Sequence, residues 1–431
     1  MSGARRFCPS GPLRGRVRVP SDKSIMQRAL VIGALCDGPV EIVTPVWAGD
    51  PLTTAGMIAD LGVRVDGLNV GTGPAVIHGA GLRGLRAPDR PLNAGNSGTG
   101  MRLLAGVLAG QHGRFVLDGD QSLRRRPMGR VVEPLRAMGV RIAAREGQFA
   151  PLTITGGSVT PISYRPPVAS AQVKSCVLLA GLYCDGETTV AEPLPTRDHT
   201  ERMLAAAGVP VRCRDATVSL TGVPALHLDR VAVPGDPSSA AFLAAAALVV
   251  EGSEIEIADV GLNPTRLGLF EVIRRMGGRV SWEATSSVGG EPRGVLCAAF
   301  SRLGAVCVTA QETTAMIDEV TLLGLLASFA EGDTVIHGVR DLRAKESDRL
   351  AAIVRILTAL GGHAEADEDT LWVQGRRLRG GRIESHGDHR LALLGAVAGL
   401  AAPDGVTVDG FAAAGISFPN FAQTLGSVLS S

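Results

Sequence analysis

A helical ending that recurs six times is the feature of this chain that most constrains its fold. Each copy has apolar residues at helical spacing, then a glycine suited to the left-handed backbone that ends a helix, and usually an alternating, strand-like run. The copies centre on Gly62, Gly139, Gly208, Gly277, Gly361 and Gly426, at intervals of 65 to 84 residues. Because recurrence of one supersecondary pattern indicates a fold built from repeats, we expect six α/β units.

Short β-branched runs between the helical endings predict strands, since Gly, Asp or Pro bounds each run. They cover residues 15–19, 41–43, 114–117, 188–190, 254–257 and 334–336. At 431 residues the chain exceeds the size at which one hydrophobic core keeps growing. We therefore expect two similar domains of three units each, with a hinge at residues 233–237, where Pro and Gly interrupt the pattern. The cleft between the domains is the expected binding site.

Composition excludes several classes of function. The chain has 43 basic and 42 acidic residues, which argues against binding nucleic acid by bulk charge, and 3% aromatic residues, which are too few for base stacking. Its seven cysteines include no C-x-x-C pair, so reduced thiols are expected rather than disulfides or zinc. The first seven residues have no apolar signal-like region, and the longest apolar run, 240–250, is too short to cross a membrane. We expect a cytoplasmic protein that binds small molecules.

Three segments in the first half could bind anions at the start of a helix, where free N–H groups and the helix dipole favour negative charge. Lys23, Ser24 and Arg28 precede or begin an apolar helix at 29–35, and the glycine-rich segment 93–102 opens another at 103–108. Ser170 and Gln172 lie at the first turn of a third helix. An ordinary capped helix explains each segment equally well. The run 123–127, with three arginines, is either a phosphate site or a solvated basic turn.

Charged residues in the second half gather in the segments 316–320, 343–349 and 386–390. Lys345 and Arg349 are four residues apart, so they are expected to share a helix face with Glu346 alongside. His386, Asp388 and His389 could suggest a metal, but no fourth ligand follows at a recognisable spacing, and we expect no metal site. The segment 79–84 matches a dinucleotide-binding pattern but does not lead into a helix, and no P-loop sequence occurs.

Taken together, these motifs resemble the 5-enolpyruvylshikimate-3-phosphate synthase family over nearly the whole chain. The matching segments are 22–28, 95–102, 126–130, 170–175, 196–200, 235–239, 316–319, 345–349 and 388–390. The resemblance implies an inside-out α/β barrel fold with two similar domains, each of three β-α-β-α-β-β repeats. It also implies that the chain crosses between domains twice, so that residues 1–20 join 236–431 and residues 21–235 form the other domain.

The resemblance assigns residues to two substrates and to catalysis. The shikimate 3-phosphate set is Lys23, Ser24, Arg28, Ser170, Ala171, Gln172, Arg197, Asp318 and Lys345. The phosphoenolpyruvate set is Lys23, Gly98, Arg126, Gln172, Arg349 and Arg390. The implied reaction is addition followed by elimination, with Asp318 and Glu346 moving protons and Lys23 stabilising the departing phosphate. Domain closure around these ligands is expected, with no metal or organic cofactor and with a monomer as the working unit.

Some positions depart from the pattern of the resemblance, and they leave alternatives open. Ser21 stands where a glycine is common, Met26 and Gln27 replace a small residue followed by His or Asn, and Ile416 stands where some members carry a lysine. A paralogue that binds without catalysis or uses another acceptor is therefore an alternative, as is an RNA-end-processing relative. The related UDP-N-acetylglucosamine enolpyruvyl transferases carry a reactive cysteine near the 98–126 region, where this chain has none.

Overall fold

The computed structural model describes residues 3–44, 46–68 and 74–429, which form two compact units. Unit 1 comprises Met1–Pro20, Pro234–Ser287 and Pro292–Ser431, and unit 2 comprises Ser21–Val233 and Val288–Glu291. One change of unit falls between Val233 and Pro234, inside the Pro- and Gly-containing segment 233–237. No helix in the described ranges combines the length and apolarity that a membrane crossing needs.

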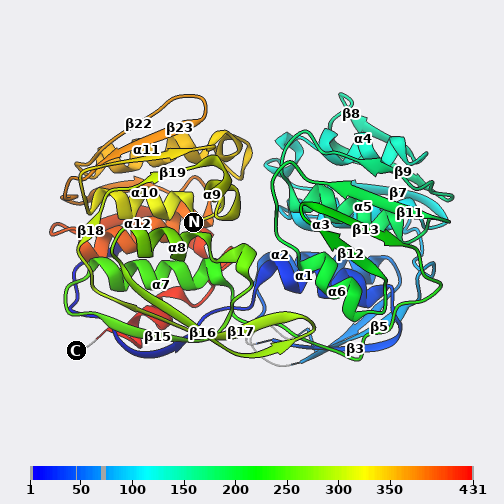
Figure 1. Cartoon of the computed structure of the whole chain (residues 1–431), viewed down its shortest axis with the longest axis horizontal. Helices are drawn as coiled ribbons and strands as arrows, with labels where there is room; N and C mark the ends of the chain where they lie inside the picture. Colours follow the sequence, from blue (N-terminus) through cyan, green and yellow to red (C-terminus); the bar gives the residue numbers. More distant parts are fainter. Residues whose placement is uncertain (1–2, 45, 69–73, 430–431) are drawn as a thin grey trace. The chain divides into compact units, whose positions relative to one another are not determined.

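Three helices that are apolar on nearly every side form the centre of each unit, because a helix without a polar face must be buried all round. In unit 2 they are α1 (Lys23–Ala34), α3 (Gly98–Ala109) and α5 (Ala171–Gly181). In unit 1 they are α7 (Pro237–Val249), α10 (Val320–Ser328) and α12 (His389–Ala401). Within each unit the strands lie at the periphery, outside these helices (Figure 1). This is the expected inside-out arrangement, and the predicted fold class is confirmed.

The sheets repeat one topology. In the sheet β6-β7-β9-β8, the strands β6 (Leu92–Asn93) and β7 (Gly113–Asp118) are parallel, and β9 (Phe149–Gly156) is antiparallel to β7 and to β8 (Arg141–Arg145). The same order occurs in β10-β11-β13-β12 (Ser163–Tyr164, Glu187–Ala191, Thr217–Thr221 and Val211–Arg214) and in β19-β21-β23-β22 (Cys307–Val308, Asp333–His337, Thr370–Gln374 and His363–Ala366). In the first two sets one α-helix follows each of the first two strands, as in the predicted β-α-β-α-β-β repeat. In the third set two α-helices, α9 (Ala310–Ala315) and α10, lie between β19 and β21.

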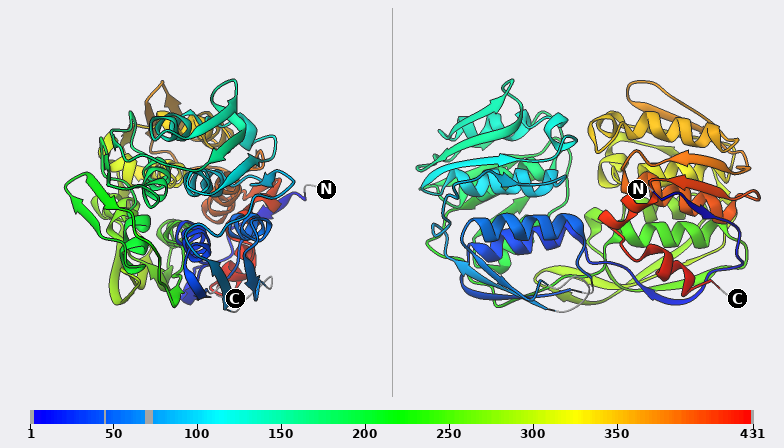
Figure 2. Two further views of the ribbon diagram at one scale, coloured as in Figure 1. Left: turned by 90° about the vertical axis from the view of Figure 1, so that its right-hand side faces the viewer. Right: turned by 180° about the vertical axis from the view of Figure 1, so that it is seen from behind.

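Two strands are exchanged where the chain changes unit. The strand β2 (Arg14–Arg18) precedes α1 in sequence but pairs in parallel with β15 (Glu254–Gly261) of unit 1. Conversely, β14 (Arg230–Ala232) precedes α7 but pairs in parallel with β3 (Asp37–Val43) of unit 2. The first strand, β1 (Arg5–Phe7), joins β25 (Val406–Asp409), so the blue N-terminal segment lies among late segments of unit 1 (Figure 2).

The recurrent glycines mark the second helix of each repeat. These helices are α2 (Gly49–Asp60), α4 (Gly129–Ala137), α6 (His199–Ala206), α8 (Gly268–Arg275), α11 (Arg349–Ala359) and α13 (Phe421–Gly426). The first five glycines have φ between 82° and 91°, as the left-handed helix end requires. The prediction is wrong for Gly426, which is the last residue of α13 itself and is not among the positive-φ glycines.

All six predicted strands are present, as β2, β3, β7, β11 (Glu187–Ala191), β15 and β21 (Asp333–His337). The remaining strands are β4 (Arg64–Asp66), β5 (Ala75–Ala80), β10 (Ser163–Tyr164), β12 (Val211–Arg214), β13 (Thr217–Thr221), β16 (Arg279–Val288), β17 (Glu291–Ala299), β18 (Leu303–Gly304), β19 (Cys307–Val308), β20 (Ala330–Glu331), β22 (His363–Ala366), β23 (Thr370–Gln374) and β24 (Gly381–Glu384). One further α-helix is α9 (Ala310–Ala315), and the short 3-10 helices are η1 (Leu123–Arg125), η2 (Pro264–Arg266), η3 (Arg340–Ala344) and η4 (Phe411–Ile416).

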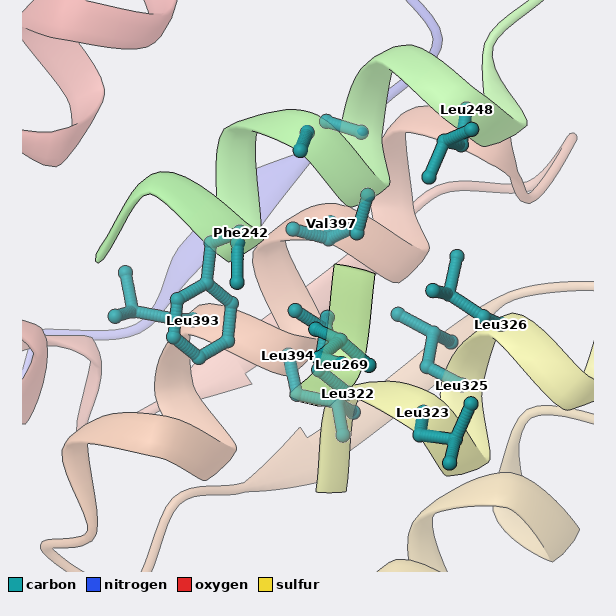
Figure 3. Close-up of a cluster of buried hydrophobic side chains, with 14 of the residues drawn as sticks. Phe242, Leu248, Leu269, Leu322, Leu323, Leu325, Leu326, Leu393, Leu394 and Val397 are labelled. Carbon is teal, nitrogen blue, oxygen red and sulfur yellow. The ribbon is translucent and has the colours of Figure 1, made fainter. Parts of the chain in front are cut away.

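The core of unit 1 lies where its central helices meet. Side chains of α7, α8, α10 and α12 point toward one another there, among them Phe242, Leu322 and Leu394 (Figure 3). Leu394 is fully buried, so Leu394→Ala is expected to lower the free energy of unfolding by about 2–5 kcal/mol through lost burial and a residual cavity. Denaturant unfolding measures this change. Trp372→Phe, at a side chain that is 39% exposed, is the control and should change stability far less.

Candidate functional site

The basic cluster of unit 2 is defined here as five predicted residues, Lys23, Arg28, Gly98, Arg126 and Gln172, together with Arg102 and the helix starts that carry them. Asp22 caps α1 by accepting a hydrogen bond from the Ile25 N–H, which places Lys23 at the first position of the helix. The Lys23 ammonium lies 3.0 Å from a carboxylate oxygen of Asp50 on α2, and its side chain is 20% exposed. Lys23 is therefore held at the start of a helix and remains within reach of a ligand.

Arg28 holds three helices together. Its guanidinium donates to Thr200 Oγ1 at 2.7 Å on α6, to Ser175 Oγ at 2.9 Å on α5, and to the Ser24 carbonyl at 3.0 Å. Burial lowers the pKa of Arg28 to about 10, although Glu201 and Asp22 oppose this effect. Arg28 therefore remains charged at neutral pH and links the start of α1 to the second turn of α5 and to the start of α6.

Gly98 begins α3, and the side chains around it explain why this position carries no Cβ. Ser97 caps the helix by accepting from the Gly100 N–H at 3.0 Å. A Cβ on Gly98 would lie 3.0 Å from Nη1 of Arg102 and 3.3 Å from Nη1 of Arg126. Arg126 is itself held by the side chain and the carbonyl of Asn96. The glycine-rich turn and the arginine run, predicted separately from the sequence, thus meet at one place.

Gln172 joins this turn to the start of α5. Its Nε2 donates to Thr99 Oγ1 at 2.8 Å, and its Oε1 accepts from Arg102. Ser170 is the N-cap of α5, and Ala171 is the first residue of the helix, as predicted. Arg197 lies half-buried between β11 and α6. Arg102 lies in one of the matching sequence segments but was assigned no role. In the structure its guanidinium contacts both Gln172 and the Pro127 carbonyl.

An acid–arginine cluster in unit 1 contains five predicted residues, Asp318, Lys345, Glu346, Arg349 and Arg390, together with Glu319 and Asp388. Asp318 Oδ1 lies 3.2 Å from the Lys345 ammonium and 3.7 Å from Nη1 of Arg349. Glu346 Oε2 lies 2.6 Å from Nη2 of Arg349. Both predicted proton-transfer acids therefore surround one buried guanidinium.

The prediction that Lys345, Glu346 and Arg349 share a helix face is wrong. Asp348 caps α11 by accepting from the Ala351 N–H at 2.9 Å, so the helix begins only at Arg349. Lys345 and Glu346 lie in the turn between η3 and α11. They still reach Asp318 and Arg349, because the turn folds back over the helix start.

Asp388 fixes the two arginines that the sequence assigned to one substrate. Its side chain is fully buried and accepts from Arg349 Nε at 2.8 Å, from Ser347 Oγ at 3.0 Å and from the Arg390 N–H at 2.9 Å. Burial would raise the pKa of Asp388, but Arg349 outweighs this effect and holds the pKa below its usual value. For Arg349 the signs are reversed: burial alone would lower its pKa, but the carboxylates of Asp388, Glu346 and Asp318 outweigh burial and raise the pKa above its usual value.

Arg390 is connected to a second buried network. Its Nη1 lies 3.4 Å from Glu319 Oε1, which also accepts a hydrogen bond from Ser238. Arg266 in turn donates to Ser238 Oγ at 2.8 Å and to Asp236 Oδ1 at 3.0 Å. Sequence reasoning missed Glu319, Asp388 and Arg266 as supporting residues. The first two lie inside recognised motifs, but only the fold shows what each of them contacts.

The structure also bears on a metal and on the departures from the family pattern. Within the described ranges, no three His, Cys, Asp or Glu side chains are grouped as metal ligands. Ser21 accepts from the Val46 N–H at 3.1 Å and also bonds Thr44, whereas Met26 is a core residue. Gln27 is buried and donates to Thr54 Oγ1 at 3.0 Å and to Ser97, so it braces the Gly98 turn. Ile416 ends η4, and no contact in the structure gives it a role.

Comparisons with known proteins find relatives that match nearly the whole chain. A family model described as EPSP synthase (3-phosphoshikimate 1-carboxyvinyltransferase) matches residues 8–425. A 3-phosphoshikimate 1-carboxyvinyltransferase of Acidithiobacillus ferrooxidans is 47% identical over 424 residues, covering 98% of this chain and 97% of the relative. One of Thermus thermophilus is 47% identical over 426 residues, covering 98% of each chain.

Solved structures extend the comparison to three dimensions. An EPSP synthase from Acinetobacter baumannii superposes with a TM-score of 0.87 at 38% identity, over 99% of this chain and 98% of that one. The enolpyruvyl transferase NikO from Streptomyces tendae gives a TM-score of 0.78 at 18% identity, over 99% of this chain and 98% of that one. The second likeness is one of fold alone.

Proposed function

This chain belongs to the EPSP synthase (3-phosphoshikimate 1-carboxyvinyltransferase) family, and we propose that its basic cluster and its acid–arginine cluster act together on one pair of substrates. The reaction transfers the enolpyruvyl group of phosphoenolpyruvate to the 5-hydroxyl of shikimate 3-phosphate and releases phosphate, as a step of the shikimate pathway. What remains to be assigned is the role of each side chain.

The observation that carries the proposal is the division of chemistry between the units. Asp318 and Glu346 lie in unit 1 around Arg349, whereas Lys23 lies in unit 2 at the start of α1. Proton transfer by the acids and charge stabilisation by Lys23 must occur on the same reacting atoms. Both units therefore supply groups that the reaction requires.

Shikimate 3-phosphate is assigned mainly to helix starts of unit 2, where N–H groups and cations favour a phosphate. The proposed contacts there are Lys23, Ser24, Ser170, Ala171, Gln172 and Arg197, with Arg28 supporting them, and Asp318 and Lys345 complete the set from unit 1. Asp318 is suited to the 5-hydroxyl because a carboxylate can accept its proton. The 3.2 Å contact between Lys345 and Asp318 keeps that carboxylate in place until the hydroxyl is bound.

Phosphoenolpyruvate carries a phosphate and a carboxylate, and guanidinium groups match both in shape and charge. We assign these groups to Arg126, Arg349 and Arg390, with Lys23, Gln172 and the Gly98 backbone alongside. Asp388 orients the Arg349 guanidinium directly, and it caps the helix that carries Arg390 by accepting from the Arg390 backbone N–H. The Arg390 guanidinium itself contacts Glu319.

In the proposed addition, the 5-hydroxyl oxygen attacks C2 of phosphoenolpyruvate while Asp318 takes the hydroxyl proton and Glu346 donates a proton to C3. In the elimination, Glu346 takes a proton back from C3 as the C2–O bond to phosphate breaks. Lys23 stabilises the leaving phosphate, which carries away the proton that Asp318 held. Glu346 suits this exchange because its contact of 2.6 Å with Nη2 of Arg349 fixes the position of the carboxyl group.

Release of inorganic phosphate from the two substrates together, and from neither alone, tests the proposal. Absence of release would favour a binding paralogue or one with another acceptor, and direct titration with each substrate would separate these two alternatives. A cytoplasmic location and a monomeric state are part of the same proposal. Size-exclusion chromatography with light scattering tests the second of them.

Gly98→Ala is expected to weaken phosphoenolpyruvate binding, because the new Cβ would lie 3.0 Å and 3.3 Å from the guanidinium groups of Arg102 and Arg126. We expect the KM for phosphoenolpyruvate to rise roughly tenfold, about 1.4 kcal/mol, and inhibition by glyphosate to weaken further because the methyl group crowds it. Steady-state kinetics with and without glyphosate measures both effects.

Gly56→Ala is the matched control, since a Cβ at this position on α2 would meet nothing within 4 Å. It should leave both constants unchanged. Equal glyphosate inhibition of the wild type and Gly98→Ala would contradict the steric account.

A further inference from the structure

Lys174 is a buried lysine in unit 2 to which the proposed mechanism gives no role. It lies on α5, two residues after Gln172, and is 1% exposed. Its ammonium lies 2.7 Å from Glu192 Oε2 and 2.6 Å from Glu201 Oε1. Lysine is rarely buried this deeply without partners, so the two carboxylates account for its presence here.

Glu192 connects this ammonium to the loop of residues 192–198, which runs from the end of β11 to α6. The Glu192 carboxylate accepts from the Thr196 N–H at 3.3 Å and from the Thr196 hydroxyl. The Lys174 ammonium also donates to the Thr196 carbonyl at 3.5 Å. The N–H and the carbonyl of Thr196 are thus both bonded, which fixes the loop immediately before Arg197.

Glu201 connects the same ammonium to α6, which follows the loop. At the neighbouring residues, Thr200 on α6 and Ser175 on α5 share a hydrogen bond of 2.7 Å, and both accept from Arg28. Lys174 and Arg28 therefore join α5, α6 and the loop from two adjacent positions. Burial would lower the pKa of Lys174, but Glu201 and Glu192 raise it overall, so the ammonium remains charged.

We propose that Lys174 is a positioning residue for shikimate 3-phosphate, setting the Arg197 loop against the first turn of α5, which carries Ser170 and Gln172. This inference rests on the proposed function, because it assigns Arg197, Ser170 and Gln172 to that substrate. Lys174 touches no substrate itself. It acts by holding two groups of ligand-binding residues, distant in sequence, at one separation.

The choice of lysine follows from the chemistry of the site. Without the ammonium, Glu192 and Glu201 would face each other as two buried carboxylates, and burial already raises the pKa of Glu201. They would separate or take up a proton, and either change moves Thr196 and hence Arg197. A displacement of about 1 Å in a positioning group is enough to cost up to 100-fold in activity.

Lys174→Met tests the inference through separate constants for the two substrates. We expect the KM for shikimate 3-phosphate and its Kd from calorimetry to rise roughly tenfold, with a smaller rise in the KM for phosphoenolpyruvate, because Gln172 alone among the positioned residues is also assigned to that substrate. Tyr183→Phe is the matched control, because it removes a buried hydrogen bond of 2.7 Å from Gln111 just beyond the far end of α5. It should lower the Tm without changing either KM.

Thr196→Val provides a second variant, in case Lys174→Met does not fold. It removes the hydroxyl bonded to Glu192 without leaving an unpaired charge. It should raise the KM for shikimate 3-phosphate several-fold and leave the KM for phosphoenolpyruvate unchanged, because Arg197 is assigned to shikimate 3-phosphate alone. Adding Glu201→Gln to Lys174→Met should recover part of the affinity, since the double variant has one fewer buried charge.

Three results would overturn the inference. A lower Tm with an unchanged Kd for shikimate 3-phosphate would mean that Lys174 only stabilises the fold. Equal increases in both KM values would mean that its effect is not specific to this substrate, and an unchanged KM in Thr196→Val would exclude the loop as the route. If the wild type itself neither binds shikimate 3-phosphate nor releases phosphate, the proposed function fails and this inference fails with it.

Discussion

Glu346→Gln is expected to lower kcat by roughly 10²–10⁴-fold, the contribution usual for a positioned proton donor and acceptor. The substitution preserves the size of the side chain but removes the group that exchanges a proton with C3 of phosphoenolpyruvate. Arg349 loses one of its carboxylate partners but retains Asp388 at 2.8 Å, so the fold should be preserved. Rapid-quench or steady-state phosphate release measures the effect.

Solvent exchange separates a proton-transfer role from a binding role for Glu346. In D₂O the wild type should incorporate deuterium at C3 of phosphoenolpyruvate in the presence of shikimate 3-phosphate, and the variant should lose this incorporation. Glu368→Gln is the control, because Glu368 is 71% exposed and pairs only at the surface with Arg340. A normal kcat in Glu346→Gln would remove this residue from the mechanism.

Asp388→Asn should impair both stability and phosphoenolpyruvate binding. The variant leaves the guanidinium of Arg349 without its fully buried carboxylate partner, and removing one partner of a buried ion pair costs about 3 kcal/mol. We also expect kcat/KM for phosphoenolpyruvate to fall about 100-fold, because Asp388 orients Arg349 and caps the helix that begins at His389 and carries Arg390. Denaturant unfolding and steady-state kinetics measure these effects independently.

The pH dependence of stability provides a further check on Asp388. Since its folded-state pKa lies below the ordinary carboxylate value, its stabilising contribution is complete above that value and is lost as the pH falls through the lowered pKa. The stability gap between the wild type and Asp388→Asn should therefore narrow as the pH drops below about 4. A gap that stays constant in acid would show that the ion pair is not its cause.

Local signals in the sequence were enough to predict the repeats. The glycines at positions 62, 139, 208, 277 and 361 end helices because each adopts positive φ, which other residues rarely adopt. The β-branched runs form strands, and the helices without a polar face are the buried ones. Spacing failed where local capping intervened, since Asp348 starts α11 too late for Lys345 to lie on it.

The exchanged strands and the buried charges depended on contacts between distant residues. No local pattern states that β2 pairs with β15, or that β14 pairs with β3. The sequence suggested Asp388 as a possible metal ligand, whereas the fold places it against Arg349. Lys174 lies in an apolar helix, and no pattern in the sequence indicates that Glu192 and Glu201 are its ion-pair partners. Periodicity and capping report interactions between residues that are close along the chain. A buried charge needs partners that compensate for its desolvation, and in this protein those partners are distant in sequence, so only the tertiary structure identifies them.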